Sequence, residues 1–261
     1  MADFPPTDDD QGVQPGTAQV LAEVERRRQE GAQALRQRPR SPFERRLVLF
    51  ADRLIYWLGR HWLAVANMAA LVYVGLPFLA PILMAAGMER PARVIHALYT
   101  PLCHQLPFRS FYLFGPQLTY TAEELRQWVG SSALLPHSFL GNAELGFKIA
   151  LCQRDVAIYG AILLAGLAYG LSGKRWRPMP GWAYVVFGLL PVGLDGGLQL
   201  LYYFVIQTFP SLQLPSFEST PLRRVITGSL FGLATVWLAY PYVQATFQEI
   251  VETLEKRFGW H

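Results

Sequence analysis

Nine side chains capable of chemistry lie in four short stretches of a sequence that is otherwise largely apolar. They are Cys103, His104, Arg109, Cys152, Arg154, Asp155, Asp195, Arg223 and Arg224. Thiolate, imidazole and carboxylate groups bind metal ions, guanidinium groups bind phosphates and carboxylates, and carboxylates and imidazoles serve as acids and bases. If the fold brings the four stretches together, they form one polar site.

The two cysteines allow three arrangements. A metal site would use Cys103, His104, Cys152 and Asp155, since sulfur with imidazole suits zinc or copper, although an adjacent Cys-His pair is not a standard zinc spacing. A Cys103–Cys152 disulfide would instead clamp a loop to a helix, and two free thiols packed in the core are the third alternative. On a helix, Cys152 and Asp155 would share a face. We expect His96 to be an interface or loop histidine.

The arginines are candidates for binding an anion, because guanidinium groups match phosphate and carboxylate geometry bidentately. These candidates are Arg109, Arg154, Arg223 and Arg224. The alternative is that they pair with Asp155, Asp195 and lipid headgroups. In an enzymatic version, His104 would be a general base or ligand, Asp155 or Asp195 a second carboxylate, and the arginines would stabilise developing negative charge. No motif specifies a reaction, so the sequence leaves open whether the protein is an enzyme.

Composition places these groups in a membrane protein. Of the 261 residues, 52 % are hydrophobic and only 16 % are charged, against roughly 25 % charged in soluble domains. The apolar stretches predict an all-α, polytopic fold with four transmembrane helices, at about 62–88, 147–171, 181–206 and 225–247. The lack of a polar domain argues against nucleic-acid binding despite a net charge of +4. The expected partners are the lipid bilayer and either another membrane protein or a second copy of the chain.

The rest of the chain completes three regions. They are a polar, Arg-rich and disordered cytoplasmic tail (1–44), the membrane domain (45–248) and an amphipathic cytoplasmic tail (249–261) that would lie along the inner surface. The loop between the first two spans is expected to contain short helices. One would cover Arg90–Tyr99, and a capping-box pattern at Thr121–Glu124 predicts the start of another.

Basic residues in the flanks predict the orientation. Fifteen of the 23 Lys and Arg residues fall on one side if the amino terminus is cytoplasmic: ten precede His61, three lie in the loop between the second and third spans, and two are near the carboxyl terminus. The positive-inside rule then places both termini of this multi-pass cell-membrane protein in the cytoplasm. The cysteines and His104 fall on the non-cytoplasmic side, at the membrane boundary.

Asp195 lies near the middle of the third predicted span. An ionised carboxylate there costs a few kcal/mol even on lenient insertion scales, so it needs a partner. The candidates are three of the arginines, the side chain of Gln199 one turn along, or protonation of the carboxyl group itself. Asp195 is therefore either part of a functional site or a pin that fixes the register of packed helices.

Four ordered motifs resemble those of an uncharacterised prokaryotic membrane-protein family, domain of unknown function 2085. The motifs are Cys103-His-Gln-Leu-Pro-Phe-Arg109, Cys152-Gln-Arg154-Asp155, Pro191-Val-Gly-Leu-Asp195-Gly-Gly-Leu-Gln199 and Leu222-Arg223-Arg-Val-Ile-Thr227-Gly228. Family members commonly have a second cysteine where this chain has Asp155, and a serine-asparagine pair where it has Glu218 to Pro221. The resemblance supplies no activity, but it implies that the polar motif residues belong together.

Two functional hypotheses follow. In the first, the polar residues form a site at the non-cytoplasmic boundary that binds a metal ion or an anionic, lipid-like ligand. In the second, the protein is a non-enzymatic accessory subunit or a small transporter, and the same residues are a structural lock. A transporter would use Asp195 as a proton or cation site, but four helices are few and no inverted repeat is visible.

Overall fold

Four long apolar helices dominate the computed structural model, which describes residues 22, 24–28, 41–129, 138–209 and 218–260. They are α2 (Pro42–Ala85), α5 (Gln153–Leu171), the continuous run of α6 (Gly181–Ala183), η2 (Tyr184–Leu189) and α7 (Leu190–Thr208), and α8 (Pro221–Phe258). Each of the four is long and apolar enough to cross a membrane. The predicted helical membrane fold is confirmed. Most of the expected polar tail lies outside the described residues.

The loop between α2 and α5 is a small α+β unit. Its elements are α3 (Glu89–Tyr99), η1 (Pro107–Arg109), β1 (Ser110–Leu113), α4 (Ala122–Val129), β2 (Gly141–Asn142) and β3 (Gly146–Cys152). Both expected short helices are present, and the capping box forms at the start of α4, where the Glu124 amide donates to Thr121 Oγ1 at 3.2 Å and the Thr121 amide to a Glu124 carboxylate oxygen at 2.7 Å.

A three-stranded antiparallel sheet, ordered β1-β3-β2, adds to the predicted helices. Its central strand β3 occupies residues that the sequence placed in the second span, so that α5 begins at Gln153 rather than at Phe147. The run Ile149–Leu151 is buried at every position. A short, continuously apolar run fits a buried strand as well as a helix, which is why hydrophobicity alone did not separate them.

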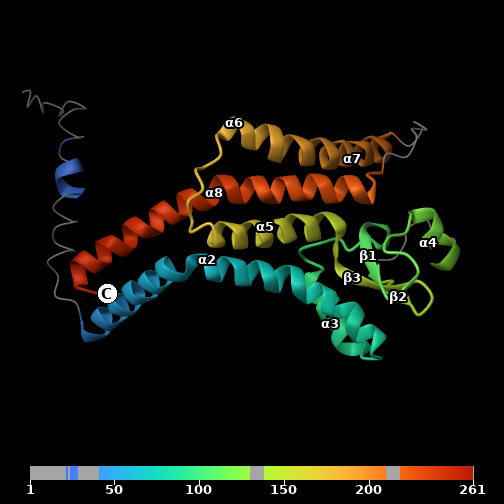
Figure 1. Cartoon of the computed structure of the whole chain (residues 1–261), viewed down its shortest axis with the longest axis horizontal. Coiled ribbons are helices and arrows are strands. Elements are labelled where there is room, and N and C mark those ends of the chain that lie inside the picture. The colour runs from blue at the N-terminus through green and yellow to red at the C-terminus, as the bar shows by residue number, and fades with distance from the viewer. Residues whose placement is uncertain (1–21, 23, 29–40, 130–137, 210–217, 261) are drawn as a thin grey trace, which may run out of the picture. The chain divides into compact units, whose positions relative to one another are not determined.

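The chain divides into two compact units, residues 1–54 and 55–261. Within the second unit, α7, α8, α5 and α2 lie side by side in that order (Figure 1). The α5–α8 contact depends on glycine, because a Cβ at Gly232 would lie 2.3 Å from the Ile158 carbonyl oxygen and one at Gly228 would lie 2.9 Å from that of Arg154. These small residues of α8 therefore let two backbones approach closely.

The carboxyl-terminal segment differs from the expected surface helix. Residues 249–258 continue α8 without a break, and part of their apolar face is covered by α2: a Cβ at Gly59 would lie only 2.7 Å from Val251 Cγ2. The Tyr56 hydroxyl donates to Glu255 Oε1 at 3.1 Å, and Trp62 Nε1 donates to Gln244 Oε1 at 2.8 Å. Long-range packing between helices thus uses a face that resembled a lipid-binding one in the sequence.

Candidate functional site

The four sequence motifs converge on one pocket of about 230 Å³ where α5 and α8 begin, beside the sheet. Its walls come from the loop after α3 (Cys103, His104, Arg109), the start of α5 (Cys152, Arg154, Asp155), and one side chain each from α7 and α8 (Gln199, Arg224). Segments separated by more than a hundred residues thus supply one set of polar groups, as the sequence motifs predicted.

A cluster of two thiols and one carboxylate occupies one wall of the pocket. The Sγ atoms of Cys103 and Cys152 and a carboxylate oxygen of Asp155 lie within 4.8 Å of one another, and both cysteines are free thiols. Cys152 is the N-cap of α5 and Asp155 lies in its first turn, so the predicted i, i+3 spacing places both on one face. The Cys103 amide donates to the Tyr99 carbonyl at 3.0 Å as the chain leaves α3. These three side chains could hold a metal ion.

The two thiols differ in acidity. A hydrogen bond from the Cys152 thiol lowers the pKa of Cys103, and the backbone N–H of Gln105 lowers it further. The same Cys103 sulfur raises the pKa of Cys152, and burial raises it again. Cys103 is therefore the thiol that ionises first, and its thiolate is the form that binds metals.

His104 does not join this cluster. Its side chain is exposed and lines the pocket, but it is not part of the group of ligand atoms formed by the two cysteines and Asp155 among the described residues. The chain reverses direction here, since Gln105 adopts a φ of +50°. A residue next to Cys103 in sequence therefore points elsewhere in space.

Buried polar side chains hold this loop from behind. The Lys148 ammonium donates to the Gln105 carbonyl at 2.8 Å, the Gln105 amide donates to the His96 carbonyl at 2.7 Å, and Gln105 Oε1 lies 2.9 Å from His96 Nδ1. Burial lowers the pKa of Lys148 to about 7 and that of His96 to about 4. Neither role was predicted: Lys148 fell at the start of the second predicted span, and His96 was expected to be an interface or loop histidine.

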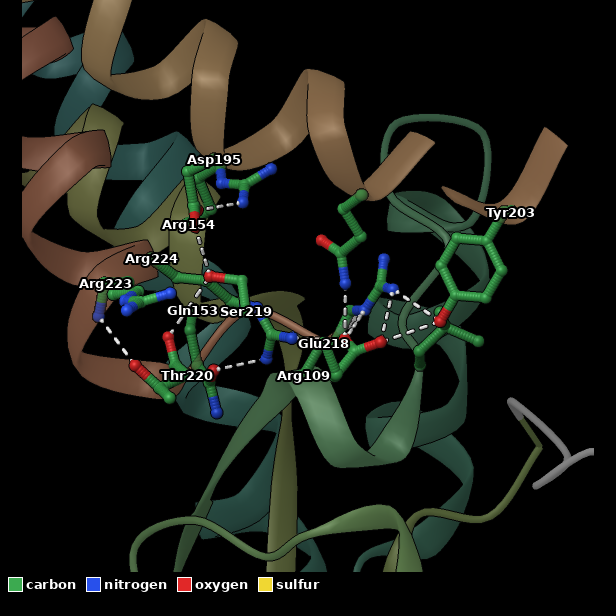
Figure 2. Close-up of polar contacts among 12 residues, drawn as sticks. Arg109, Gln153, Arg154, Asp195, Tyr203, Glu218, Ser219, Thr220, Arg223 and Arg224 are labelled. Carbon is green, nitrogen blue, oxygen red and sulfur yellow. Dashed lines mark hydrogen bonds and ion pairs between the residues drawn. The ribbon is translucent and has the colours of Figure 1, made fainter. Parts of the chain in front are cut away.

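Of the partners considered for Asp195, the structure provides an arginine. Arg154 Nη2 lies 2.5 Å from Asp195 Oδ2, and the Ser219 hydroxyl donates to Oδ1 at 2.6 Å (Figure 2). The carboxylate is 8 % exposed and does not line the pocket. A Cβ at the neighbouring Gly196 would lie 2.7 Å from Arg154 Nη1, so glycine makes room for the guanidinium. The pair joins α5 and α7.

Glu218 is the centre of a second network, and sequence reasoning missed it. Its carboxylate accepts from Arg109 Nε at 2.8 Å, Gln199 Nε2 at 2.6 Å and the Tyr203 hydroxyl at 2.7 Å, and it also pairs with Arg224 (Figure 2). Burial raises the pKa of Glu218, but the hydrogen bonds from Arg109 and Tyr203 outweigh it, so the net pKa lies below the ordinary value. The sequence signal that could have indicated a polar partner here was the pair of polar side chains Gln199 and Tyr203, one helical turn apart in the third predicted span.

The adjacent arginines of α8 have different surroundings. Arg224 is 2 % exposed, and its Nη1 donates to Gln153 Oε1 at 3.1 Å. Arg223 is exposed and does not line the pocket. Consecutive residues of a helix point about 100° apart, so only one of the two can face the pocket. Of the four predicted anion-binding arginines, Arg109, Arg154 and Arg224 line the pocket and Arg223 does not.

Comparison with known proteins supports the family resemblance. Residues 136–238 match the family described as "Predicted membrane protein (DUF2085)". The matched region contains three of the four motifs, and Cys103 to Arg109 precede it. The chain is also 26 % identical over 148 residues to "Uncharacterized protein MJ1492" of Methanocaldococcus jannaschii, which covers 56 % of this chain and 67 % of that protein. No solved structure matches the chain significantly.

Proposed function

For a chain that carries the DUF2085 membrane domain over residues 136–238, we propose that Cys103, Cys152 and Asp155 bind a transition-metal ion of the zinc or copper class. The observation that carries the proposal is the approach of their three ligand atoms to within 4.8 Å of one another in the wall of a pocket. Small side-chain rotations would suffice, because ligands bonded at 2.0–2.3 Å to one tetrahedral zinc lie roughly 3.3–3.8 Å apart.

The donor set favours a soft or borderline ion. Two sulfur ligands select zinc or copper(I) over calcium and magnesium, which prefer oxygen. Three protein ligands leave a fourth position, which His104 could fill from the rim by a loop adjustment and which otherwise faces the pocket. A closed structural zinc site has four protein ligands, whereas a site with three keeps a position for water or substrate.

Orientation adds support. With both termini in the cytoplasm, as the distribution of basic residues predicts, the pocket lies at the non-cytoplasmic membrane boundary. A metal ion could then enter from outside without crossing the apolar region. Asp195 serves this site indirectly: both of its oxygens are engaged, by Arg154 and Ser219, so it fits a register pin better than a ligand or a general base.

Metal binding by the full-length, detergent-purified protein tests the proposal. Cobalt(II) should give thiolate charge-transfer absorption, and zinc should displace it with a stoichiometry of one per chain. Cys103→Ser, Cys152→Ser and Asp155→Asn should each weaken zinc binding by at least tenfold. Glu144→Gln, which changes an exposed acid of the same loop, is the matched control. His104→Ala reports whether the fourth ligand is imidazole.

Two outcomes would overturn the proposal. The first is wild-type cobalt absorption in the Cys152→Ser variant. The second is the absence of reactive thiols in freshly purified, denatured and unreduced protein, together with no bound metal. That result would favour a Cys103–Cys152 disulfide, the structural alternative that the proximity of the two sulfurs also allows.

A further inference from the structure

The arginines that line the same pocket have the chemistry of an oxyanion site. We propose that Arg109, Arg154 and Arg224 bind a phosphate-type group, and that the carboxylate of Glu218 is an internal competitor for two of these arginines. The inference rests on the proposed function in that both place a ligand in this pocket.

The contacts of Glu218 show what the arginine wall recognises. Arg109 contacts the two carboxylate oxygens through separate nitrogens, Nε at 2.8 Å and Nη2 at 3.2 Å, in the side-by-side geometry that guanidinium also uses with phosphate. Arg224 and Gln199 converge on Glu218 Oε1. Because Arg109, Arg224 and Gln199 line the pocket and Glu218 does not, the donors face the pocket while their carboxylate approaches from beside it.

Donors remain unused in this wall. Arg154 Nε and Arg224 Nε are buried and have no hydrogen-bond partner among the described residues. Arg224 is 2 % exposed, so bulk solvent does not reach it, and buried donors are normally paired. A tetrahedral phosphate offers more acceptor oxygens than a carboxylate and can engage several guanidinium groups at once.

The charges of the wall point the same way. Three guanidinium groups line it, and the carboxylates that pair with them are those of Asp195 and Glu218. One positive charge is therefore left over once Asp155 is assigned to the metal cluster. A buried excess of positive charge attracts an anion and repels a second cation.

The phosphate could be free or could belong to a lipid. On α5, the residues that follow Asp155 begin an apolar groove of about 400 Å³ between α5 and α8, lined by residues such as Val156, Gly160, Leu164 and Leu233. A headgroup phosphate in the pocket would have an apolar surface nearby for its chain. The two sources share the same headgroup chemistry, so the experiment must separate them.

Phosphate titration of the purified, zinc-loaded protein, followed by calorimetry, tests the proposal. Arg109→Gln should weaken binding at least tenfold, whereas Glu218→Gln should strengthen it several-fold by removing the competitor. Arg223→Gln, the exposed neighbour of Arg224, is the matched control and should bind as the wild type does. Reconstitution into nanodiscs of phosphatidylcholine with or without one-tenth phosphatidic acid identifies the source: a lipid headgroup would abolish the response to added phosphate only when phosphatidic acid is present.

Opposite effects of Arg109→Gln and Glu218→Gln on phosphate binding distinguish an anion-binding site from a structural lock. If Glu218→Gln weakens or abolishes phosphate binding in a folded protein, or if Arg223→Gln weakens it as much as Arg109→Gln, the proposal is wrong. The Cys103→Ser variant keeps the two proposals apart, because it should lose zinc and retain phosphate binding. Phosphate binding without zinc binding would overturn only the metal site, and zinc binding without phosphate binding only the oxyanion site.

Discussion

Replacing Asp195 by asparagine is expected to destabilise the protein by about 3 kcal/mol, at the lower end of the cost of leaving one member of a buried ion pair unpaired. The lower end applies because Asp195 is 8 % exposed but the Arg154 side chain is 21 % exposed, so water can reach the remaining charge. Asparagine keeps the size of the side chain and an acceptor for the Ser219 hydroxyl, so the loss comes mainly from the ion pair with Arg154.

The assay is reversible unfolding of the detergent-solubilised protein in a series of denaturant concentrations, completed as a double-mutant cycle. Arg154→Met should cost a similar amount, because it leaves the Asp195 carboxylate unpaired in an apolar environment. The double variant Arg154→Met with Asp195→Asn should cost much less than the sum of the two single variants, since neither partner is then left as an unpaired buried charge. The coupling free energy is then at least about 2 kcal/mol, within the range seen for residues in contact.

Additive costs in this cycle would refute the reasoning, because they would mean that the two side chains do not depend on each other. Zinc affinity is a second readout, which distinguishes a register pin at Asp195 from a role in the metal site. The Asp195→Asn variant, where it remains folded, should bind zinc as tightly as the wild type. Loss of zinc affinity with unchanged stability would make Asp195 part of the metal site instead.

Two further predictions concern the loop and the helix packing. The pKa of His96 is about 4 in the folded protein and 6.5 when unperturbed, so the unfolded chain binds more protons between these values. The contribution of His96 to the free energy of unfolding should therefore be fully present above pH 6.5, and the free energy should fall by about 3 kcal/mol as the pH drops to 4. In denaturant titrations, a His96→Gln variant should lack this pH dependence. An equal pH dependence in the variant would exclude His96 as the cause. Gly232→Ala should lower the free energy of unfolding by about 1–3 kcal/mol, because the added Cβ overpacks against the Ile158 carbonyl. Gly160→Ala, with nothing within 4 Å of its Cβ, should change the unfolding midpoint little. Equal effects would show that the α5–α8 contact is looser than described.

The spanning helices were predictable because their signal is local. A stretch without charges that is long enough to cross a bilayer can be read directly from the sequence, and Asp195 inside such a stretch implied an arginine partner. The structure supplies that partner in Arg154. The i, i+3 spacing of Cys152 and Asp155 likewise indicated that they lie close together, although Cys152 ends β3 and is the N-cap of α5 rather than a helical residue.

The remaining features depend on contacts between distant segments. Strand β3 looked like the start of a helix because an apolar run carries no period that separates the two when every residue is buried. Lys148, 0 % exposed in that strand, becomes an internal clamp only because the strand runs behind the loop that carries Gln105. No local pattern indicated that a lysine at the start of the predicted span 147–171 would point inward.

Glu218 shows most clearly why a site can be hidden in a known set of motifs. It stands between the third and fourth motifs rather than in one of them, yet its carboxylate joins Arg109 of the loop before β1, Gln199 and Tyr203 of α7, and Arg224 of α8. In an apolar environment, several buried arginines require compensating carboxylates, and the nearest segment must supply them. Because α8 buries Arg224 next to Arg109, an acid within reach must offset their charge, and Glu218, in the segment before α8, is that acid.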